Sequence, residues 1–290
     1  MKIEFTKMHG TGNDYVYIDM FKHDYHFENI EEFIRRISDR RFGIGSDGMI
    51  MIAPSEKADV RMIMYNSDGS EGKMCGNGIR CVAKYAYENG IVDKTEISVE
   101  TKSGIKELKL TVQDGKVDYV TVDMGKAILN PKDIPVITDD PKASDFISKP
   151  VIVNNQEYEI TCVSMGNPHA VIFTRDIDSL DLEKIGPMFE HHPIFPERVN
   201  TEFVEVTSPH TLKMRVWERG SGETSSCGTG SCAVAVAAVL NGYCHINEEI
   251  TINLKGGQLK DTYLENGHVI MKGPATHVFD GEIETKGMGL

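Results

Sequence analysis

Residues 74–78 are Met-Cys-Gly-Asn-Gly, and residues 226–230 are Ser-Cys-Gly-Thr-Gly, so one chain carries the same cysteine turn twice. A strand-like run precedes each turn, and an apolar, helix-like run follows it. The helical runs end at similar stop signals, Gly90 in the first and Asn241 with Gly242 in the second. Two copies of a strand, a glycine turn and a helix predict two halves of matching topology.

The internal repeat extends beyond the cysteine turns. Further matched segments are 61–66 and 213–218, 97–99 and 250–252, and the Gly-Asn pairs at 12–13 and 166–167. We therefore expect an α/β (α+β) fold of two pseudo-symmetric domains, each a mostly antiparallel sheet wrapped around the helix that follows its cysteine, with the active site in the cleft between them. A Pro- and Asp-rich stretch from 131 to 150 predicts the loop-rich entry to the second domain.

The composition indicates a soluble, cytoplasmic protein that acts on small molecules. The chain has 290 residues, of which 40% are hydrophobic, enough for one large or two medium cores. A net charge of −13 argues against a nucleic-acid partner, and no apolar run is long enough for a membrane helix. Six cysteines in a chain of this length do not form the pattern of a disulfide framework, so we expect free thiols.

The cysteine turns themselves predict proton chemistry. Backbone N–H groups and the helix dipole at a helix N-terminus favour thiolate over thiol. Flanking glycines also let backbone N–H groups approach an anion, so each turn can hold a carboxylate. Two thiols that face each other across a pocket can remove a proton from one side of a carbon and return it to the other, which inverts a stereocentre. The alternative is a tight turn with a buried, inert cysteine at Cys75 and at Cys227.

Other motifs point away from nucleotides and metals. Residues 43–48, Gly-Ile-Gly-Ser-Asp-Gly, match the dinucleotide pattern by letter, but a helix-like run precedes them and a strand-like run follows, which is the reverse of the required order. The spacing of the cysteines does not suit a zinc site, so we expect no metal. We predict that the four remaining cysteines pack in the core. They are Cys81, Cys162, Cys232 and Cys244.

Several polar residues are candidates for ligand contact. Asn13, Asn167 and Asn200 lie in turn-like stretches, where an Asn side chain capping the backbone is the alternative. Asn66 and the pair Glu218-Arg219 end the strand-like runs that lead to the two cysteines. That position relative to the thiols favours a role in binding.

In combination, these motifs resemble the diaminopimelate epimerase family. The resemblance covers essentially the whole chain and rests on residues 8–14, 65–70, 75–78, 164–169, 197–200, 218–220, 226–230 and 275–281. Proline racemases are similar in having two cysteine turns, but their pattern has His at the position of Asn77.

The resemblance implies a cofactor-independent interconversion of LL- and meso-diaminopimelate by a thiolate and a thiol, serving lysine and peptidoglycan synthesis. It implies a homodimer, with no cofactor, no nucleic acid and no membrane involved. It also implies an N-terminal domain made of residues 1–126 and 274–290, because the C-terminal tail returns to it, and a C-terminal domain of residues 127–273.

The resemblance further assigns roles to residues. Cys75 and Cys227 are the acid and base, and His169 and Glu218 tune their pKa values. The reacting α-carboxylate is held by Gly76, Asn77, Gly228 and Thr229. The other substrate contacts are Asn13, Asn66, Asn167, Asn200, Glu218 and Arg219. Two departures stand out, because Gly48 replaces a Gln found in some members and Phe279 replaces a Tyr expected at the dimer contact.

Three alternatives remain open at this stage. The nearest is a cofactor-independent racemase of another amino acid, of histidine or proline type, on the same scaffold. The others are a pyridoxal-dependent racemase and a non-catalytic amino-acid-binding protein with dispensable thiols.

Overall fold

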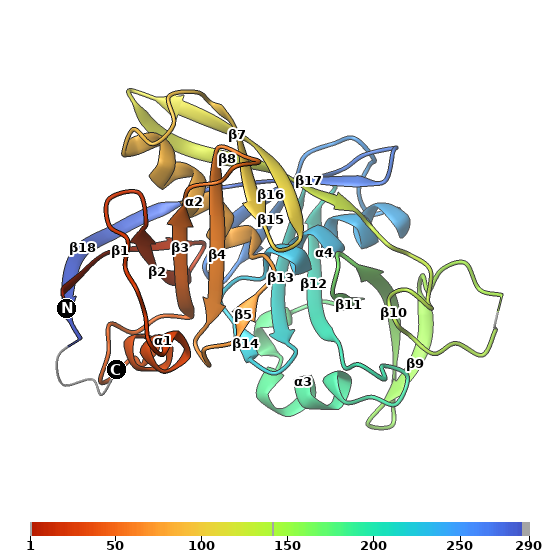
Figure 1. The fold of residues 1–290 in the computed structure, drawn as a ribbon. Helices are drawn as coiled ribbons and strands as arrows, with labels where there is room; N and C mark the ends of the chain where they lie inside the picture. The colour runs from red at the N-terminus through yellow and green to blue at the C-terminus, as the bar shows by residue number, and fades with distance from the viewer. Residues whose placement is uncertain (1, 141, 286–290) are drawn as a thin grey trace. The chain divides into compact units, whose positions relative to one another are not determined.

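The computed structural model describes residues 2–140 and 142–285, which form two compact units (Figure 1). The first unit comprises Met1–Val122 with Gly273–Leu290, and the second comprises Asp123–Lys272. The domain borders expected from the sequence, 126/127 and 273/274, lie a few residues from these.

The first unit is a sheet with two helices. Neighbouring strands follow the order β18-β1-β2-β3-β4-β6-β7-β8, with β5 paired to β4. The β2–β3 and β4–β6 pairs are parallel and the others antiparallel. The elements are β1 (Lys2–Gly10), β2 (Asn13–Asp19), α1 (Ile30–Ser38), β3 (Gly48–Ala53), β4 (Val60–Asn66), β5 (Glu71–Gly72), α2 (Gly76–Glu88), β6 (Glu96–Thr101), β7 (Gly104–Gln113), β8 (Lys116–Lys126) and β18 (Thr276–Glu284).

The second unit repeats this plan. Its strands follow the order β9-β10-β11-β12-β13-β15-β16-β17, with β14 paired to β13, and its parallel pairs, β11–β12 and β13–β15, occupy the same places. The elements are β9 (Lys149–Val153), β10 (Gln156–Ser164), β11 (Pro168–Phe173), η1 (Ile177–Ser179), α3 (Leu182–Glu190), β12 (Asn200–Ser208), β13 (Thr211–Glu218), β14 (Gly222–Thr224), α4 (Gly228–Leu240), β15 (Ile250–Leu254), β16 (Gly257–Tyr263) and β17 (His268–Gly273).

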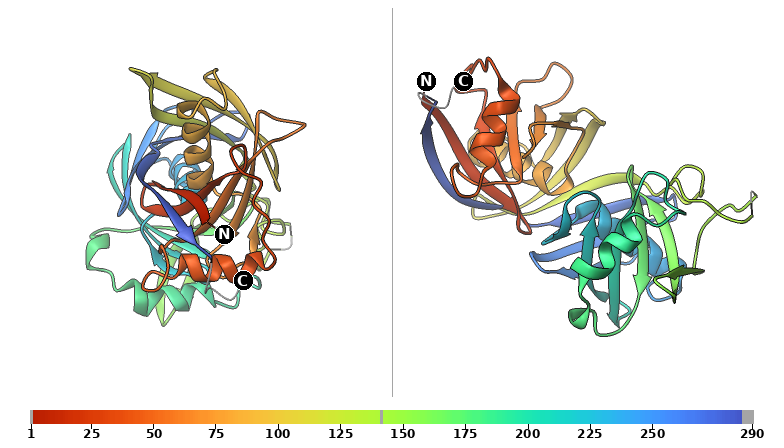
Figure 2. Two further views of the ribbon diagram at one scale, coloured as in Figure 1. Left: turned by 60° about the vertical axis from the view of Figure 1, so that its left-hand side comes forward. Right: turned by 90° about the horizontal axis from the view of Figure 1, so that it is seen from below.

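The C-terminal strand completes the first unit. β18 runs antiparallel to β1 over almost its whole length, and the two lie side by side in Figures 1 and 2. In the second unit the equivalent place beside β10 is taken by β9. The edge strand of the first unit, β18, therefore comes from the end of the chain, whereas the equivalent strand of the second unit, β9, directly precedes β10.

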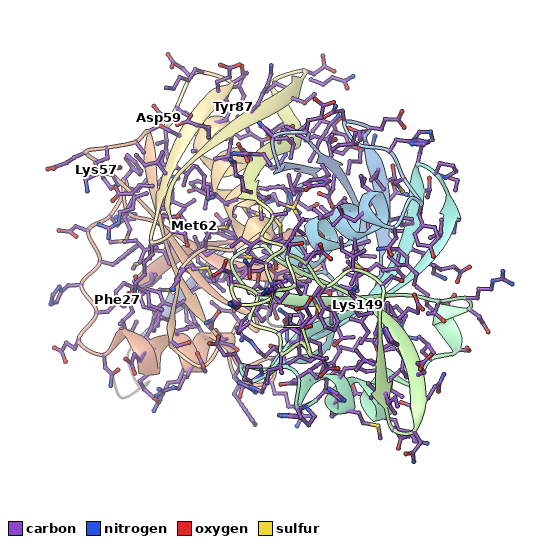
Figure 3. All side chains as sticks on the ribbon, turned by 90° about the vertical axis from the view of Figure 1, so that its right-hand side faces the viewer. Phe27, Lys57, Asp59, Met62, Tyr87 and Lys149 are labelled. Carbon is purple, nitrogen blue, oxygen red and sulfur yellow. The ribbon has the colours of Figure 1, made fainter. Side chains whose placement is uncertain are left out.

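Each unit wraps its sheet around one buried helix. Ten of the 13 residues of α2 are buried, as are ten of the 13 residues of α4. A helix that is covered on all sides needs apolar or small residues around its whole circumference, which the alanine- and valine-rich run of α4 provides. Gly78 lets α2 approach the sheet, because a Cβ there would lie 2.6 Å from Ile50 Cδ1 and 3.2 Å from Cε of Met62, which is labelled in Figure 3.

Both predicted helices are present, but each begins earlier in the chain than its apolar pattern indicates. The apolar patterns that follow the cysteine turns predict helices from Ile79 to Asn89 and from Ser231 to Leu240, whereas α2 begins at Gly76 and α4 at Gly228. The first turn of each helix is rich in glycine, a poor helix former, so the sequence gives little sign of it. No helix in the described ranges combines the length and the apolar character needed to cross a membrane.

Helix α3 braces the loop that follows β13. Trp217 on β13 packs on Gly186 of α3, and its Nε1 donates to Glu190 Oε2 at 2.7 Å. Glu190 Oε1 in turn accepts from the backbone N–H of Gly220 at 2.9 Å and from Arg198 at 3.1 Å. A well-packed α3 is therefore needed to hold the end of β13 in place.

We predict that Gly186→Ala destabilises the protein by about 1–3 kcal/mol, the usual cost of overpacking. A Cβ at this position would lie 2.3 Å from Trp217 Cδ2, and this clash outweighs the helix propensity that alanine gains, about 1 kcal/mol. Urea denaturation measures the free energy of unfolding. Lys184→Ala, an exposed change on the same helix, is the control and should stay within about 0.5 kcal/mol of the parent. Equal stability of the two variants would contradict the packing argument.

Candidate active site

Cys75 lies at the N-terminus of α2 with its sulfur in the helix cap. Its backbone is extended, with φ −132° and ψ 119°, and its Sγ accepts a hydrogen bond from the backbone N–H of Gly78 at 3.3 Å. The Cys75 thiol donates to Asn13 Oδ1 at 3.2 Å. The side chain is half-buried. The cysteine predicted to do chemistry is thus also the cap of the buried helix.

Cys227 repeats this geometry at the N-terminus of α4. Its backbone angles are φ −121° and ψ 112°, and its Sγ accepts from the N–H of Gly230 at 3.4 Å. Thr229 Oγ1 lies 3.5 Å from the sulfur, and Cys227 is buried, with 5% of its surface exposed. The two copies of the sequence repeat therefore place their cysteine sulfurs in the same position, each accepting from the backbone N–H three residues further on.

The pKa values of both thiols differ from the sequence-based expectation. Burial raises the pKa of Cys75, and this effect outweighs the backbone N–H groups of Gly78 and Asn77, which lower it. Burial raises the pKa of Cys227 well above its usual value, and the nearby charges of Glu218 and Glu202 add to the increase. The backbone N–H groups at the helix N-termini lower the pKa of each thiol, as predicted. Burial raises it by more, so the prediction that the thiolates are favoured is wrong for the overall pKa.

The first turns of α2 and α4 present the residues expected to hold a carboxylate. Gly76, Asn77 and Gly228 are buried there, and Thr229 is half-buried. N–H groups in the first turn of a helix have no intrahelical acceptor, so they suit an anion. Each unit therefore carries one turn with the geometry for this role.

The other candidates of the first unit differ in their surroundings. Asn13 is half-buried, and its Oδ1 faces the thiol of Cys75. Asn66 is exposed at the end of β4, and its Nδ2 donates to Ser70 Oγ at 3.1 Å, which is the turn-capping arrangement. Gly48 has φ 152°, and a Cβ there would lie 2.0 Å from the Tyr65 carbonyl oxygen, so a Gln at this position requires a shift of the backbone.

In the second unit, Asn200 holds Arg219 in place. Asn200 is buried, its Nδ2 donates to the carbonyl of Pro168 at 2.9 Å, and its Oδ1 accepts from the backbone N–H of Arg219 at 2.9 Å. The Arg219 guanidinium donates to the carbonyl of Glu197 at 2.7 Å. The Asn200 amide thus has two backbone partners that set the position of the arginine.

Glu218 lies next to Cys227 and is half-buried. Burial raises the pKa of Glu218, although hydrogen bonds with Thr224 and Cys227 act in the opposite direction. Thr224 Oγ1 donates to Glu218 Oε1. Because a carboxyl group of raised pKa can exchange a proton with a neighbouring thiol, the structure is compatible with the tuning role that the resemblance implies.

Glu202 is a residue of this site that the sequence analysis missed. His169 and Glu202 are both fully buried, and His169 Nδ1 lies 2.7 Å from Glu202 Oε1. The other ring nitrogen of His169, Nε2, lies 3.1 Å from Asn167 Oδ1. Within the described residues, Glu202 Oε2 has no hydrogen-bond partner. A buried, incompletely paired carboxylate is costly, and such groups are concentrated at functional sites.

Only the structure singles out Glu202. It stands at an inward position of β12 among buried neighbours, Asn200 to Val204, where an acidic residue is out of character. Without its partner in view, a glutamate in a strand gives no reason to expect it near the histidine.

The described residues contain no group of three or more His, Cys, Asp or Glu side chains arranged to hold a metal ion. All six cysteines are free thiols, and the four assigned to packing, Cys81, Cys162, Cys232 and Cys244, are buried.

The family model and the curated relatives that match this chain belong to one family. A family model described as diaminopimelate epimerase matches residues 5–130 and 161–278. The diaminopimelate epimerase of Desulfovibrio desulfuricans is 56% identical over 284 residues, covering 97% of this chain and 98% of its own length. That of Acetivibrio thermocellus is 55% identical over 283 residues, covering 97% and 99%.

Among solved structures, a phenazine biosynthesis protein of the PhzF family from Bacillus anthracis matches with a TM-score of 0.70. The match covers 98% of this chain and 99% of that chain, at 16% sequence identity. At this identity the likeness supports the two-domain fold alone.

We predict that Glu202→Gln makes Cys227 easier to ionise. The neutral amide keeps an acceptor for His169 but removes a negative charge that raises the pKa of the Cys227 thiol. Iodoacetamide reacts with the thiolate, so the pH profile of Cys227 alkylation, followed by peptide mass spectrometry, should move to lower pH, with several-fold faster labelling at pH 8. Asp261→Asn, which changes another fully buried carboxylate of the same unit, is the control. Identical Cys227 profiles in the two variants would show that Glu202 has no such influence.

Proposed function

Because the chain belongs to the diaminopimelate epimerase family, we propose that it interconverts LL- and meso-diaminopimelate with Cys75 and Cys227 as the two proton-transfer groups. The observation that carries the proposal is the pair of cysteines that cap the buried helix of each unit, each with a backbone N–H directed at its sulfur. The chain is an isomerase by family.

The proposed reaction uses one cysteine as thiolate and the other as thiol. The thiolate takes the α-proton, so a C–H bond breaks and an S–H bond forms. The thiol then gives its proton to the opposite face of the carbon, which leaves it as the thiolate. The direction of the reaction decides which cysteine acts as base. This scheme requires both half-sites to meet one substrate.

The α-carboxylate would be held by the first turns of the two helices. Charge develops on this carboxylate as the α-proton leaves, and we propose that the backbone N–H groups of Gly76, Asn77, Gly228 and Thr229, in the first turns of α2 and α4, stabilise it. In other enzymes one such donor contributes roughly 3–4 kcal/mol to the transition state. Donors fixed in a helix turn need no reorganisation when the charge appears.

The distal amino-acid group of the substrate calls for partners of both signs. We propose that Arg219 binds the distal carboxylate, because a guanidinium matches a carboxylate in shape and charge. Glu218 and the amides of Asn13, Asn66, Asn167 and Asn200 complete the proposed contacts. His169 and Glu218 are proposed to tune the two cysteines.

We also infer a cytoplasmic homodimer that works without a cofactor, a nucleic acid or a membrane, in lysine and peptidoglycan biosynthesis. An exposed apolar pair on β18, Val278 and Phe279, with 49% and 44% of their surfaces exposed, supports a contact between copies of the chain. The Phe279 ring packs edge-on against Phe5, with centroids 5.9 Å apart. Sedimentation equilibrium of the purified protein tests the dimer.

The test of the function is proton exchange in D2O. The reduced protein, with no added cofactor, is incubated with LL-diaminopimelate, and the α-proton signal and isomer ratio are followed by NMR and chiral chromatography. We expect deuterium incorporation and approach to an LL/meso mixture. No exchange by protein with free Cys75 and Cys227 thiols would contradict the substrate assignment, and a panel of other amino acids would then test the racemase alternative.

We predict that Cys75→Ala and Cys227→Ala each lower the rate of epimerisation by about 10²–10⁴-fold, the range for loss of a general acid or base. Cys244→Ala is the matched control, because Cys244 is a buried cysteine outside both helix caps, and this variant should retain activity. Full activity in either of the first two variants would refute the two-base scheme.

A further inference from the structure

The motif at residues 43–48 has a structural role that the sequence analysis did not find. These residues connect α1 to β3, and Asp47 within them lies against the start of β2. The backbone N–H of Asp47 donates to the carbonyl of Asp14 at 2.8 Å, and the N–H of Asp14 donates to Asp47 Oδ2 at 3.1 Å. Two reciprocal bonds therefore fix Asp47 beside Asn13 and Asp14.

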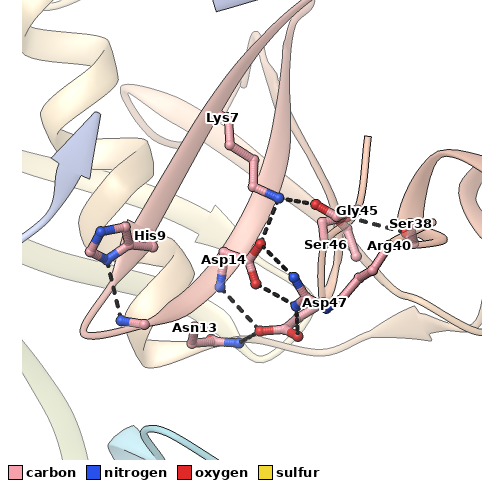
Figure 4. A network of polar contacts seen from close by, with 11 residues as sticks. Lys7, His9, Asn13, Asp14, Ser38, Arg40, Gly45, Ser46 and Asp47 are labelled. Carbon is pink, nitrogen blue, oxygen red and sulfur yellow. Dashed lines mark hydrogen bonds and ion pairs between the residues drawn. The ribbon is translucent and has the colours of Figure 1, made fainter. Parts of the chain in front are cut away.

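The Asp47 carboxylate contacts the side chain of Asn13. Asn13 Nδ2 donates to Asp47 Oδ2 at 2.7 Å (Figure 4). On the other side of the same amide, Asn13 Oδ1 accepts from the Cys75 thiol at 3.2 Å. A chain of two hydrogen bonds thus links Asp47 to the proposed catalytic sulfur.

A cluster of charges holds Asp47 in place. Arg40 donates to Asp47 Oδ1 at 2.8 Å and to both oxygens of Asp14, at 2.6 and 3.2 Å (Figure 4). Lys7 pairs with Asp14 at 2.5 Å and also donates to the carbonyl of Gly45. Two cations and two carboxylates balance in this cluster, and Lys7 is buried.

These contacts dictate the orientation of the Asn13 amide. A carboxylate is only an acceptor, so the NH₂ group of Asn13 must face Asp47, and the carbonyl oxygen must then face Cys75. An amide oxygen accepts a hydrogen bond from a thiol but repels a thiolate. The opposite orientation would direct an N–H at the sulfur and favour the thiolate. Asp47 therefore selects which protonation state of Cys75 the Asn13 amide supports.

We propose that Asp47 is a positioning residue that locks Asn13 with its carbonyl oxygen toward Cys75, so that Cys75 rests as an oriented thiol. The significance for catalysis rests on the proposed function. A thiolate beside a carbonyl oxygen is more basic than one that receives an N–H bond. Since an amino-acid α-proton is a far weaker acid than a thiol, a more basic thiolate is better matched to remove it.

The test measures ionisation of Cys75 in the absence of substrate. In Asp47→Ala the Asn13 amide is free to turn its NH₂ group to the sulfur, so the pH profile of Cys75 alkylation by iodoacetamide should move to lower pH, with several-fold faster labelling at pH 7.5. Cys227 in the same sample is an internal reference and should not change. Asp14→Asn removes a carboxylate from the same cluster without touching the Asn13 side chain, so its Cys75 profile should match the parent protein.

A double variant separates orientation from charge. If Asp47 acts through Asn13, Asp47→Ala has no effect on Cys75 in an Asn13→Ala background. A shift that persists in that background, or a Cys75 profile in Asp47→Ala equal to that of the parent, would overturn the proposal. Should Asp47→Ala fail to fold, Asp47→Ser also removes the carboxylate that accepts from Asn13 Nδ2 and is expected to shift Cys75 in the same direction. An unshifted profile there would also overturn it.

This experiment is independent of the substrate assignment, because alkylation requires no diaminopimelate. Failure of exchange in D2O together with a shifted Cys75 profile would refute the proposed function and leave the role of Asp47 intact. Normal exchange with an unshifted profile would refute the role of Asp47 alone.

Discussion

The hydrogen bond from the backbone N–H at the third helix position to the cysteine sulfur is the interaction on which both half-sites depend. It ties Cys75 to Gly78 and Cys227 to Gly230, and so fixes each sulfur at the end of a buried helix. The N–H groups favour the thiolate, while burial opposes it more strongly. The result is a sulfur that is hard to ionise and strongly basic once ionised, which suits abstraction of a weakly acidic proton from carbon.

The fold supplies what this arrangement requires. A helix whose first turn is buried needs a sheet around it and small residues where it meets that sheet. The glycine that donates to each sulfur also provides the space, since a Cβ would lie 2.6 Å from Ile50 Cδ1 at Gly78 and 2.7 Å from Glu202 Oε1 at Gly230. One residue type thus serves packing and chemistry together. Both units repeat the same strand order, and the C-terminal strand β18 fills in the first the place that β9 fills in the second.

The repeat, the two cysteine turns and the fold class were predictable because they depend on local patterns repeated along the chain. The residues that orient the site were not. Asp47 meets Asn13 and Glu202 meets His169 across 34 and 33 residues, in contacts between different segments that no spacing rule encodes. Asp47 also lies in a glycine motif that matches the dinucleotide pattern by letter, which gives no indication of a contact with Asn13. The net pKa change of the thiols was mispredicted because the sequence shows the helix N-terminus but not the depth of burial.

The two half-sites share a backbone plan and differ in their polar partners. Cys75 contacts the neutral amide of Asn13, whereas Cys227 lies near two carboxylates, Glu218 and Glu202. Burial raises both pKa values, and the negative charges of Glu218 and Glu202 add to the increase at Cys227. A two-base inversion needs one sulfur that starts as base and another that starts as acid, and an exactly symmetric pair would have no preferred assignment. The two helix caps are equivalent in backbone and unequal in polar partners, so the surroundings of each sulfur, and not the helix caps alone, distinguish the two half-sites.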